Sequence, residues 1–174
     1  MTNKMTEEQQ LDLLMSEDDV LNGMLEAADF KTSEDYRKKL QIVRNVKTTN
    51  EVTGEIEEVQ KKFFEFTIRP LDETELYACR KGAMKRVPSQ RNKNIMEDAE
   101  LDFVKYKALK IYAATVGEDG KKIWDNPAIK KKLNTLNALD VINETLTAGE
   151  KDWIDDVIDE ISGYGENREE QVKN

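Results

Sequence analysis

The feature that most constrains the fold is an amphipathic segment near the end of the sequence, at residues 146–164. Its large apolar residues recur at helical spacing: Trp153, Ile154, Val157, Ile158 and Ile161. On a helix these residues fill one arc of about 140°. The opposite arc carries four aspartates: Asp152, Asp155, Asp156 and Asp159. The segment is therefore predicted to form a helix with one apolar wall and one anionic wall.

Both ends of this helix carry capping signals. Thr147 followed by Glu150 matches a capping box, in which each side chain accepts a hydrogen bond from the other residue's backbone N–H. Gly163 matches the glycine that commonly follows the last turn of a helix. The helix is therefore expected to be short and well bounded.

The apolar wall has two possible roles. A stripe of this kind most often closes a hydrophobic core. The alternative is a contact surface for a partner helix. In that case the partner-binding residues are Trp153, Val157, Ile161 and Tyr164. The core is the commoner outcome, so we expect Trp153 to be buried.

Nearer the N-terminus the apolar period changes from helical to alternating. Two runs alternate apolar with polar residues: Leu40, Ile42 and Val46 in the first, and Phe64, Phe66 and Ile68 in the second. Turn residues at 48–54 separate the runs, and Pro70 ends the second because proline lacks a backbone donor. The pattern predicts a β-hairpin over residues 40–69. A lone hairpin is marginally stable, so its phenylalanine face must pack on helices.

Residues after the hairpin predict helices. Asp72 with Glu75 forms a second capping signature, and Val87–Pro88 ends the helix that it opens. A polar linker follows at residues 89–94. The apolar spacing beyond it predicts a second helix over about residues 97–116.

A third helix is expected to begin at Asn126 and Pro127, which are typical of an N-cap and a first helical residue. Its apolar residues continue as far as Ile142. With the closing segment, these elements predict an α+β fold. We expect an N-terminal helical arm, a β-hairpin, and a mostly helical C-terminal body of about four helices.

The net charge of −9 over 174 residues is unevenly distributed. Residues 1–35 hold ten acids and two bases, and residues 150–174 hold nine acids and three bases, whereas residues 36–149 have a net charge of +5. The acidic ends could fold over the basic middle or face separate partners, and the sequence allows both.

The sequence predicts three parts. They are an acidic helical arm at 1–35, a single α+β domain at 36–164, and a disordered tail at 165–174. Within the α+β domain the hairpin is expected at 40–69 and the helices at 73–162.

The composition argues against an enzyme and against a cofactor or a metal. The absence of histidine removes the commonest general base and the commonest metal ligand. The eight glycines form no phosphate-binding loop, and the single cysteine, Cys79, forms neither an internal disulfide nor a usual zinc site. No catalytic, cofactor-binding or metal-binding residue is expected.

No run of residues has the pattern of a membrane span or a secretion signal, so a soluble protein of a reducing cytoplasm is expected.

A block of basic residues is a second candidate binding surface. The block comprises Arg80, Lys81, Lys85, Arg86 and Arg91, with Lys93 beyond them. Such a patch can bind phosphate backbones. The acidic character of the whole chain and the lack of aromatic residues across 78–102 argue against nucleic acid as a partner. A solvated loop, or docking of the chain's own acidic ends, is the commoner explanation.

Three segments resemble those of a known family. Residues 146–164 have the form Leu-x-x-Gly-Glu, a helix, and then Ile-Ser-Gly-aromatic. Residues 64–75 resemble a strand that runs into a helix, and residues 5–14 are also similar. In these segments the sequence resembles the XkdN-like tail assembly chaperones of contractile-tailed phages and prophages. The loop at 47–60 and the tail after Tyr164 are longer than the family pattern needs.

The resemblance implies a non-catalytic function in virion assembly. Such a chaperone binds the long tape measure protein in the host cytoplasm and keeps it soluble while tail tube subunits polymerise around it. It leaves before the tail is complete and is absent from the mature virion. In this class a translational frameshift often produces a longer form of the chaperone, which would be a further partner. A homo-oligomer is conceivable for a protein that coats a filament precursor.

Two other functions are compatible with the residues. One is a nucleic-acid-binding accessory protein that uses the basic residues between Arg80 and Lys93. The other is a structural subunit of the particle, such as a tail or connector protein. A structural subunit would be found in purified particles, whereas an assembly factor would not.

Overall fold

The computed structural model describes residues 17–30 and 36–164, which fall in two compact units divided between Asp35 and Tyr36. In the first unit, helix α2 spans Glu17–Phe30. Four of its large apolar side chains are exposed: Val20, Leu21, Met24 and Leu25. The rest of the predicted arm and the predicted tail at 165–174 lie outside the described residues.

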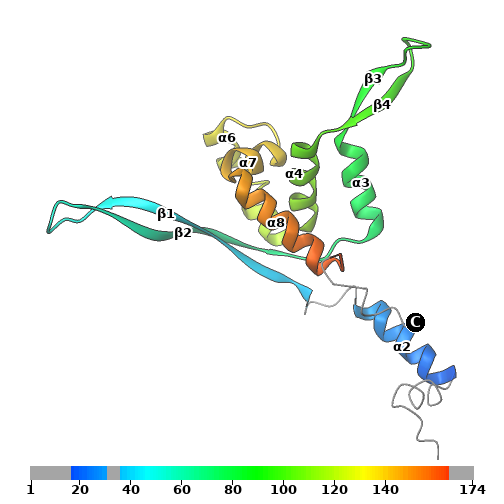
Figure 1. Cartoon of the computed structure of the whole chain (residues 1–174), viewed down its shortest axis with the longest axis horizontal. Helices are drawn as coiled ribbons and strands as arrows, with labels where there is room; N and C mark the ends of the chain where they lie inside the picture. Colours follow the sequence, from blue (N-terminus) through cyan, green and yellow to red (C-terminus); the bar gives the residue numbers. More distant parts are fainter. Residues whose placement is uncertain (1–16, 31–35, 165–174) are drawn as a thin grey trace, which may run out of the picture. The chain divides into compact units, whose positions relative to one another are not determined.

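The second unit begins with the predicted hairpin (Figure 1). Strand β1, Lys38–Thr49, pairs antiparallel with β2, Ile56–Ile68. The loop is shorter than expected, because the strands extend to Thr49 and Ile56. Gly54 adopts a left-handed φ of 72° in this turn. The pairing shifts between Ile42 and Val43, which leaves Phe63 as the extra residue of a β-bulge.

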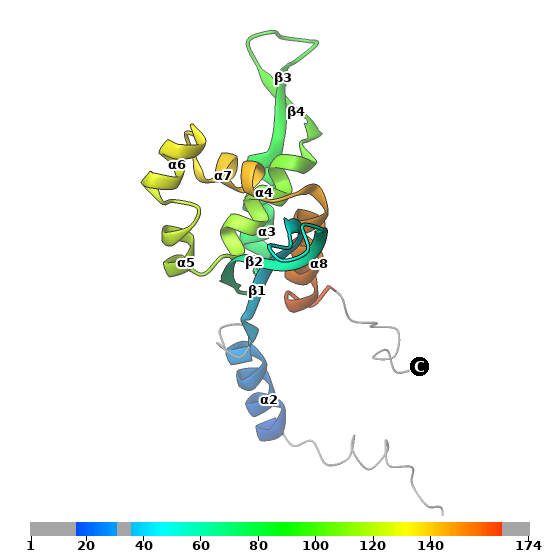
Figure 2. The same ribbon diagram turned by 90° about the vertical axis from the view of Figure 1, so that its left-hand side faces the viewer.

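Six helices form the body of this unit (Figure 2). They are α3 at Glu73–Ala83, α4 at Phe103–Ala114, α5 at Gly117–Lys122, α6 at Pro127–Leu133, α7 at Ala138–Thr145 and α8 at Ala148–Ile161. Helix α4 is central, because α3, α7 and α8 all pack against it. The α+β class is confirmed. The three predicted capping sites are also confirmed, at Asp72, Asn126 and Thr147.

A second hairpin replaces the end of the helix predicted as far as Val87 and the start of the helix predicted over 97–116, and the polar linker predicted at 89–94 lies in the turn of this hairpin. Strand β3, Met84–Pro88, pairs antiparallel with β4, Met96–Leu101. Helix α4 begins only at Phe103, where the Asp102 side chain accepts a hydrogen bond from the backbone N–H of Lys105 at 3.0 Å. In Figures 1 and 2 this hairpin extends away from the helices. The prediction that this helix begins at about residue 97 was wrong. The apolar spacing was extended to residues before Asp102, which is the N-cap of the helix.

The predicted third helix is broken into α6 and α7. Asn134 ends α6 in the left-handed conformation, with φ at 55°, and Asn137 caps α7 through a hydrogen bond from Asp140 N–H. Leu136 lies in this break and is 93% exposed, although it falls within the range of the predicted third helix. The body therefore has more helices than the four expected.

The hydrophobic core joins the base of the first hairpin to the helices. Phe66 and Ile68 of β2 are fully buried, and so is Trp124, which follows α5. The Trp124 ring meets Phe66 edge to face at 5.4 Å, and its indole N–H donates to Thr115 Oγ1 at 2.9 Å. The expected packing of the phenylalanine face on the helical body is thus confirmed. Within residues 17–30 and 36–164, no helix has the length and apolar character needed to cross a membrane.

Candidate partner-binding site

The apolar wall of α8 divides between core and surface. Ile154 and Ile158 are fully buried, and Val157 and Ile161 pack partly buried against the core. Trp153 is 43% exposed, and Tyr164, beyond the helix, is exposed as well. The expectation that Trp153 is buried was wrong, because the apolar arc is wider than the face that the neighbouring elements cover. Of the four candidate partner-binding residues, only Trp153 and Tyr164 lie largely on the surface.

Replacing Trp153 by alanine should therefore leave the protein folded. We expect the free energy of unfolding to fall by about 1–2 kcal/mol, since part of the ring still covers apolar atoms. Urea unfolding followed by far-ultraviolet circular dichroism measures this change. Tyr164→Ala is the control and should change stability by less than about 0.5 kcal/mol. A loss of cooperative unfolding in Trp153→Ala would contradict the surface placement.

The anionic wall of α8 is not simply a solvated face. Three of its four aspartates meet lysines of α4. Lys107 forms an ion pair with Asp152. Lys110 is buried and lies 2.8 Å from Asp155 and 2.6 Å from Asp159. Part of the acidic C-terminal region thus folds onto the basic middle of the chain, one of the two arrangements that the charge distribution allows.

Two effects act on the pKa of Lys110. Burial by itself lowers the pKa of this ammonium, but the hydrogen bonds and charges of Asp155 and Asp159 overcome the burial. The net result is a pKa above the ordinary value for lysine. Lys110 is therefore a charged residue at neutral pH, held inside the body by two carboxylates.

The first hairpin fastens both ends of α8. Arg44 donates two hydrogen bonds to the Glu150 carboxylate, at 2.7 and 2.8 Å, and Lys38 pairs with Glu160 at 3.0 Å. The hydrogen bond from Arg44 lowers the pKa of Glu150. The Arg44 guanidinium also lies over the Phe63 ring, 5.2 Å from its centre. These contacts hold α8 in place, so the side chains that it exposes are positioned by a rigid scaffold.

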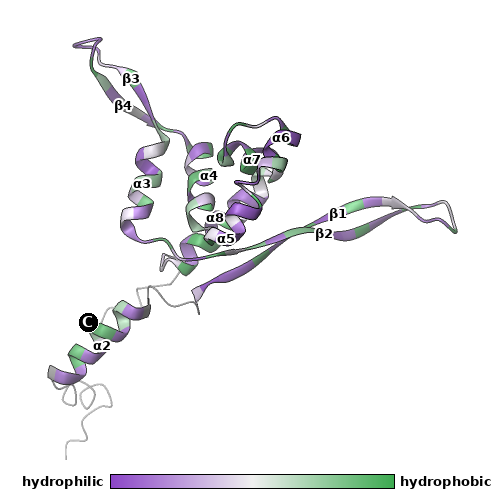
Figure 3. Ribbon diagram, turned by 180° about the vertical axis from the view of Figure 1, so that it is seen from behind, coloured by the Kyte–Doolittle hydropathy of each residue, from purple (hydrophilic) through white to green (hydrophobic). Residues whose placement is uncertain are grey.

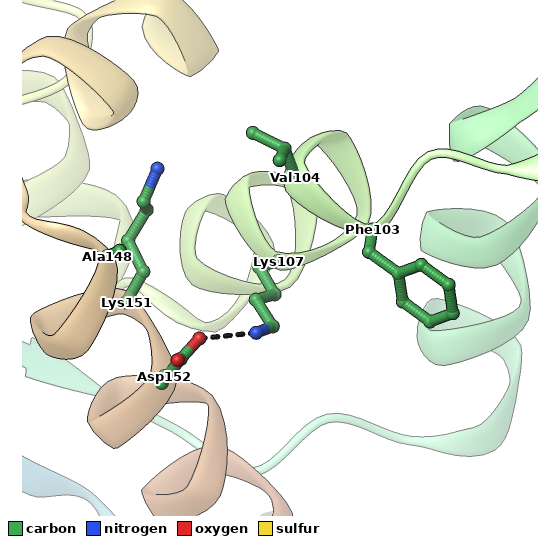
Figure 4. Close-up of a pocket in the computed structure, with 6 residues that line it drawn as sticks. All are labelled: Phe103, Val104, Lys107, Ala148, Lys151 and Asp152. Atoms are coloured by element: carbon green, nitrogen blue, oxygen red, sulfur yellow. Dashed lines mark hydrogen bonds and ion pairs between the residues drawn. The ribbon is translucent and has the colours of Figure 1, made fainter.

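A groove lies between the first turns of α4 and α8 (Figure 4). It has a volume of about 260 Å³ and is lined by Phe103, Val104, Lys107, Ala148, Lys151 and Asp152. Phe103 is 66% exposed and Val104 is exposed beside it. Figure 4 shows Lys107 and Asp152 pointing toward each other between the two helices. The groove thus combines apolar side chains with both signs of charge.

Sequence reasoning missed Phe103 as a site residue. Its signal was present: two large apolar residues follow the N-cap Asp102 directly, on a helix whose core stripe is Ala108, Ile111 and Ala114. Apolar residues left outside such a stripe are candidates for contact with a partner. The exposed pair makes this groove a stronger candidate than the apolar wall of α8 alone.

The predicted basic patch lies on α3 and the second hairpin. Its five residues are exposed, and they come from α3, β3 and the turn after β3: Arg80, Lys81, Lys85, Arg86 and Arg91. Strand pairing brings acids beside them, since Glu97 and Glu100 of β4 lie opposite Val87 and Lys85. The mixed charge disfavours a phosphate backbone as the ligand of this surface.

Metal-binding and thiol chemistry find little support in the described part of the chain. Among the side chains of residues 17–30 and 36–164, no three acidic or cysteine side chains lie close enough together to hold a metal ion. Cys79 is buried in α3, and burial raises the pKa of its thiol. A raised pKa lowers the fraction of reactive thiolate at neutral pH.

Exposed apolar side chains beside charged groups, on a rigid helical body, are typical of a protein that works by binding another protein. A comparison with known families agrees. Residues 38–174 match the family described as Phage XkdN-like tail assembly chaperone protein, and the chain belongs to this family. The match confirms the resemblance seen in the sequence, although it does not include residues 5–14. No curated protein and no solved structure gives a significant match.

Proposed function

We propose that this tail assembly chaperone binds the tape measure protein of its phage in the host cytoplasm. It keeps that protein soluble while tail tube subunits polymerise around it, and it is absent from the finished virion. Membership of the tail assembly chaperone family is the observation that carries the proposal. Binding is stoichiometric and needs no catalysis.

The groove between α4 and α8 is the proposed contact site. A tape measure protein is long and helical, and its apolar side chains are exposed until the tube surrounds it. Phe103 and Val104 supply an apolar surface for such a side chain, while Lys107, Lys151 and Asp152 can pair with the charges that flank it. The net charge of −9 favours a soluble complex.

The four residues predicted on α8 and just beyond it extend this contact. Trp153 and Tyr164 offer aromatic surface of the kind enriched at protein interfaces. Val157 and Ile161 are packed largely against the core, so their role in the proposal is to support the exposed neighbours.

Replacing Phe103 by aspartate should weaken capture of the tape measure protein by roughly tenfold or more, because it puts a charge on the apolar side of the groove. The fold should persist, since Phe103 is 66% exposed and an acid is favourable in the first turn of a helix. The measurement is the amount of soluble tape measure protein that co-purifies after co-expression of the two genes.

Tyr77→Asp is the matched control, because Tyr77 is equally exposed, at 66%, and lies on α3 outside the groove. It should leave capture unchanged. If the unmodified chaperone neither solubilises nor co-purifies the tape measure protein, the proposed function fails. If Phe103→Asp binds normally while the unmodified protein also binds, the function stands and the groove is the wrong site.

Mass spectrometry of purified particles separates the proposal from a structural tail or connector subunit. The chaperone should be missing from particles that contain the tape measure protein. Finding it there in the copy number of a structural protein would favour the alternative.

A further inference from the structure

The outer half of the first hairpin carries a feature that the chaperone function does not explain. Between the bulge at Phe63 and the helices, the hairpin is part of the hydrophobic core. Beyond it, every residue of β2 from Ile56 to Lys62 is exposed, a length of about 23 Å at 3.3 Å per residue. Figures 1 and 3 show this part reaching past the helices with both apolar and polar residues along it.

The outer edge of β2 is occupied at its base and open beyond it. Near the core, Val116 N–H donates to the Thr67 carbonyl at 2.9 Å, and Thr67 N–H donates to the Asp119 carboxylate at 2.7 Å. From Ile56 to Lys62, β1 is the only strand paired with β2 among the residues that the structure describes. An open edge of this length is a template for pairing with another strand.

The residues along this edge are complementary to themselves. The run is Ile56, Glu57, Glu58, Val59, Gln60, Lys61 and Lys62, with acids before Val59 and bases after it. An antiparallel copy of the strand, related by a two-fold axis at Val59, sets Val59 opposite Val59. The same register sets Glu57 opposite Lys61 at two symmetric positions. Glu58 and Lys62 become diagonal neighbours, also twice.

We propose that two copies of this protein associate through β2, antiparallel and centred on Val59, to form one four-stranded sheet. The occupant of the open edge is therefore a second copy of the same chain. A two-fold interface of this kind is self-complementary, which is the common arrangement in soluble homodimers. The proposal does not rest on the identity of the chaperone's client.

The apolar residues of the hairpin agree with the register. Val46 of β1 pairs directly with Val59 of β2. The Val59 side chain is 40% exposed although Val46 lies beside it. In the joined sheet the four valines form one continuous row on the same face, flanked by the pairs of Glu57 with Lys61. A two-stranded hairpin is marginally stable in water, whereas a sheet of more strands with an apolar face is stable.

Alternation of side chains limits the competing registers. A two-fold axis requires a residue to lie opposite itself, so the nearest alternatives are centred on Glu58 and on Gln60. The register centred on Glu58 is disfavoured because it sets two glutamates opposite each other. The remaining alternative is the register centred on Gln60. That register sets Val59 against Lys61 and Glu57 against Phe63, where the bulge disturbs the strand. Centring on Val59 joins like apolar residues and opposite charges, and is the favoured register.

Sedimentation velocity of the full chain over a wide concentration range tests the proposal. Glu57→Lys and Lys61→Glu should each weaken self-association by roughly tenfold or more, because like charges then face each other at both symmetric positions. An equal mixture of the two variants should associate as the unmodified protein does, since each mixed pair again sets an acid opposite a base. The double variant E57K/K61E should also associate.

Glu51→Lys is the matched control. It makes the same charge change in the exposed turn, outside the paired run, and should leave self-association unchanged. The proposal is overturned if the unmodified protein is a monomer at every concentration, or if either single variant associates as strongly as the unmodified protein. It is also overturned if the mixture and the double variant both stay monomeric while their circular dichroism shows intact folding.

Discussion

Trp124→Ala should lower the free energy of unfolding by about 3–5 kcal/mol, the range for removing a large buried aromatic side chain. The Trp124 ring is fully buried between the helices and the base of the first hairpin. It makes edge-to-face contacts with Phe66 at 5.4 Å and Phe64 at 5.9 Å. Alanine would remove both contacts and leave a cavity that the paired strands cannot close.

Urea unfolding followed by circular dichroism measures the loss, and two other variants give the comparison. Trp124→Phe keeps a ring but loses the hydrogen bond to Thr115, so it should cost about 1–2 kcal/mol. Leu136→Ala is the surface control, because Leu136 is 93% exposed; it should cost less than about 0.5 kcal/mol. A similar loss for Trp124→Ala and Leu136→Ala would show that the core does not centre on Trp124.

Elements with local signals were predictable from the sequence. The first hairpin follows from strict alternation at Phe64, Phe66 and Ile68, and α8 follows from helical spacing between two strong caps. In each case the pattern that predicts the element lies within a few neighbouring residues of the sequence. Such local agreement between pattern and structure is what makes a segment predictable.

The second hairpin was not predictable in this way. Strand β4 contains Glu97 and Glu100 and shows no apolar alternation, so it is a strand because β3 lies beside it. Pairing of this kind depends on the turn and on the neighbouring strand, not on the propensity of the segment. Tertiary context overrides propensity most easily in short polar strands.

The two tryptophans show why the candidate site was only partly predictable. Trp153 lies in a regular apolar stripe and is half exposed, whereas Trp124 lies in a short connection and is fully buried. The burial of Trp124 depends on contacts with Phe64 and Phe66, which are distant in sequence. For the same reason the sequence could not show that Phe103 remains uncovered.

Lys110→Met should lower the free energy of unfolding by about 2–4 kcal/mol. Breaking a buried ion pair is strongly destabilising because it leaves its partner's charge uncompensated. Lys110 lies between Asp155 and Asp159, and methionine fills a similar volume without a charge. We place the loss toward the lower part of this range, since the Asp159 side chain is partly exposed and can turn to solvent.

Lys107→Met is the matched control, one turn earlier on the same helix. Lys107 also pairs with an aspartate of α8, but its side chain is 32% exposed against 3% for Lys110. Solvent screens an exposed pair, so this variant should lose no more than about 1 kcal/mol. Urea unfolding of both variants at neutral pH makes the comparison.

The pH dependence of the Lys110→Met deficit follows from the raised pKa of Lys110. A cation whose pKa is higher in the folded protein stabilises it below the unfolded pKa, about 10.4 for lysine. That stability is lost only as the pH rises through the folded value. The difference between the variant and the unmodified protein should therefore stay constant from about pH 6 to 9 and shrink in stronger base. Equal losses for Lys107→Met and Lys110→Met would show instead that burial does not set the strength of these pairs.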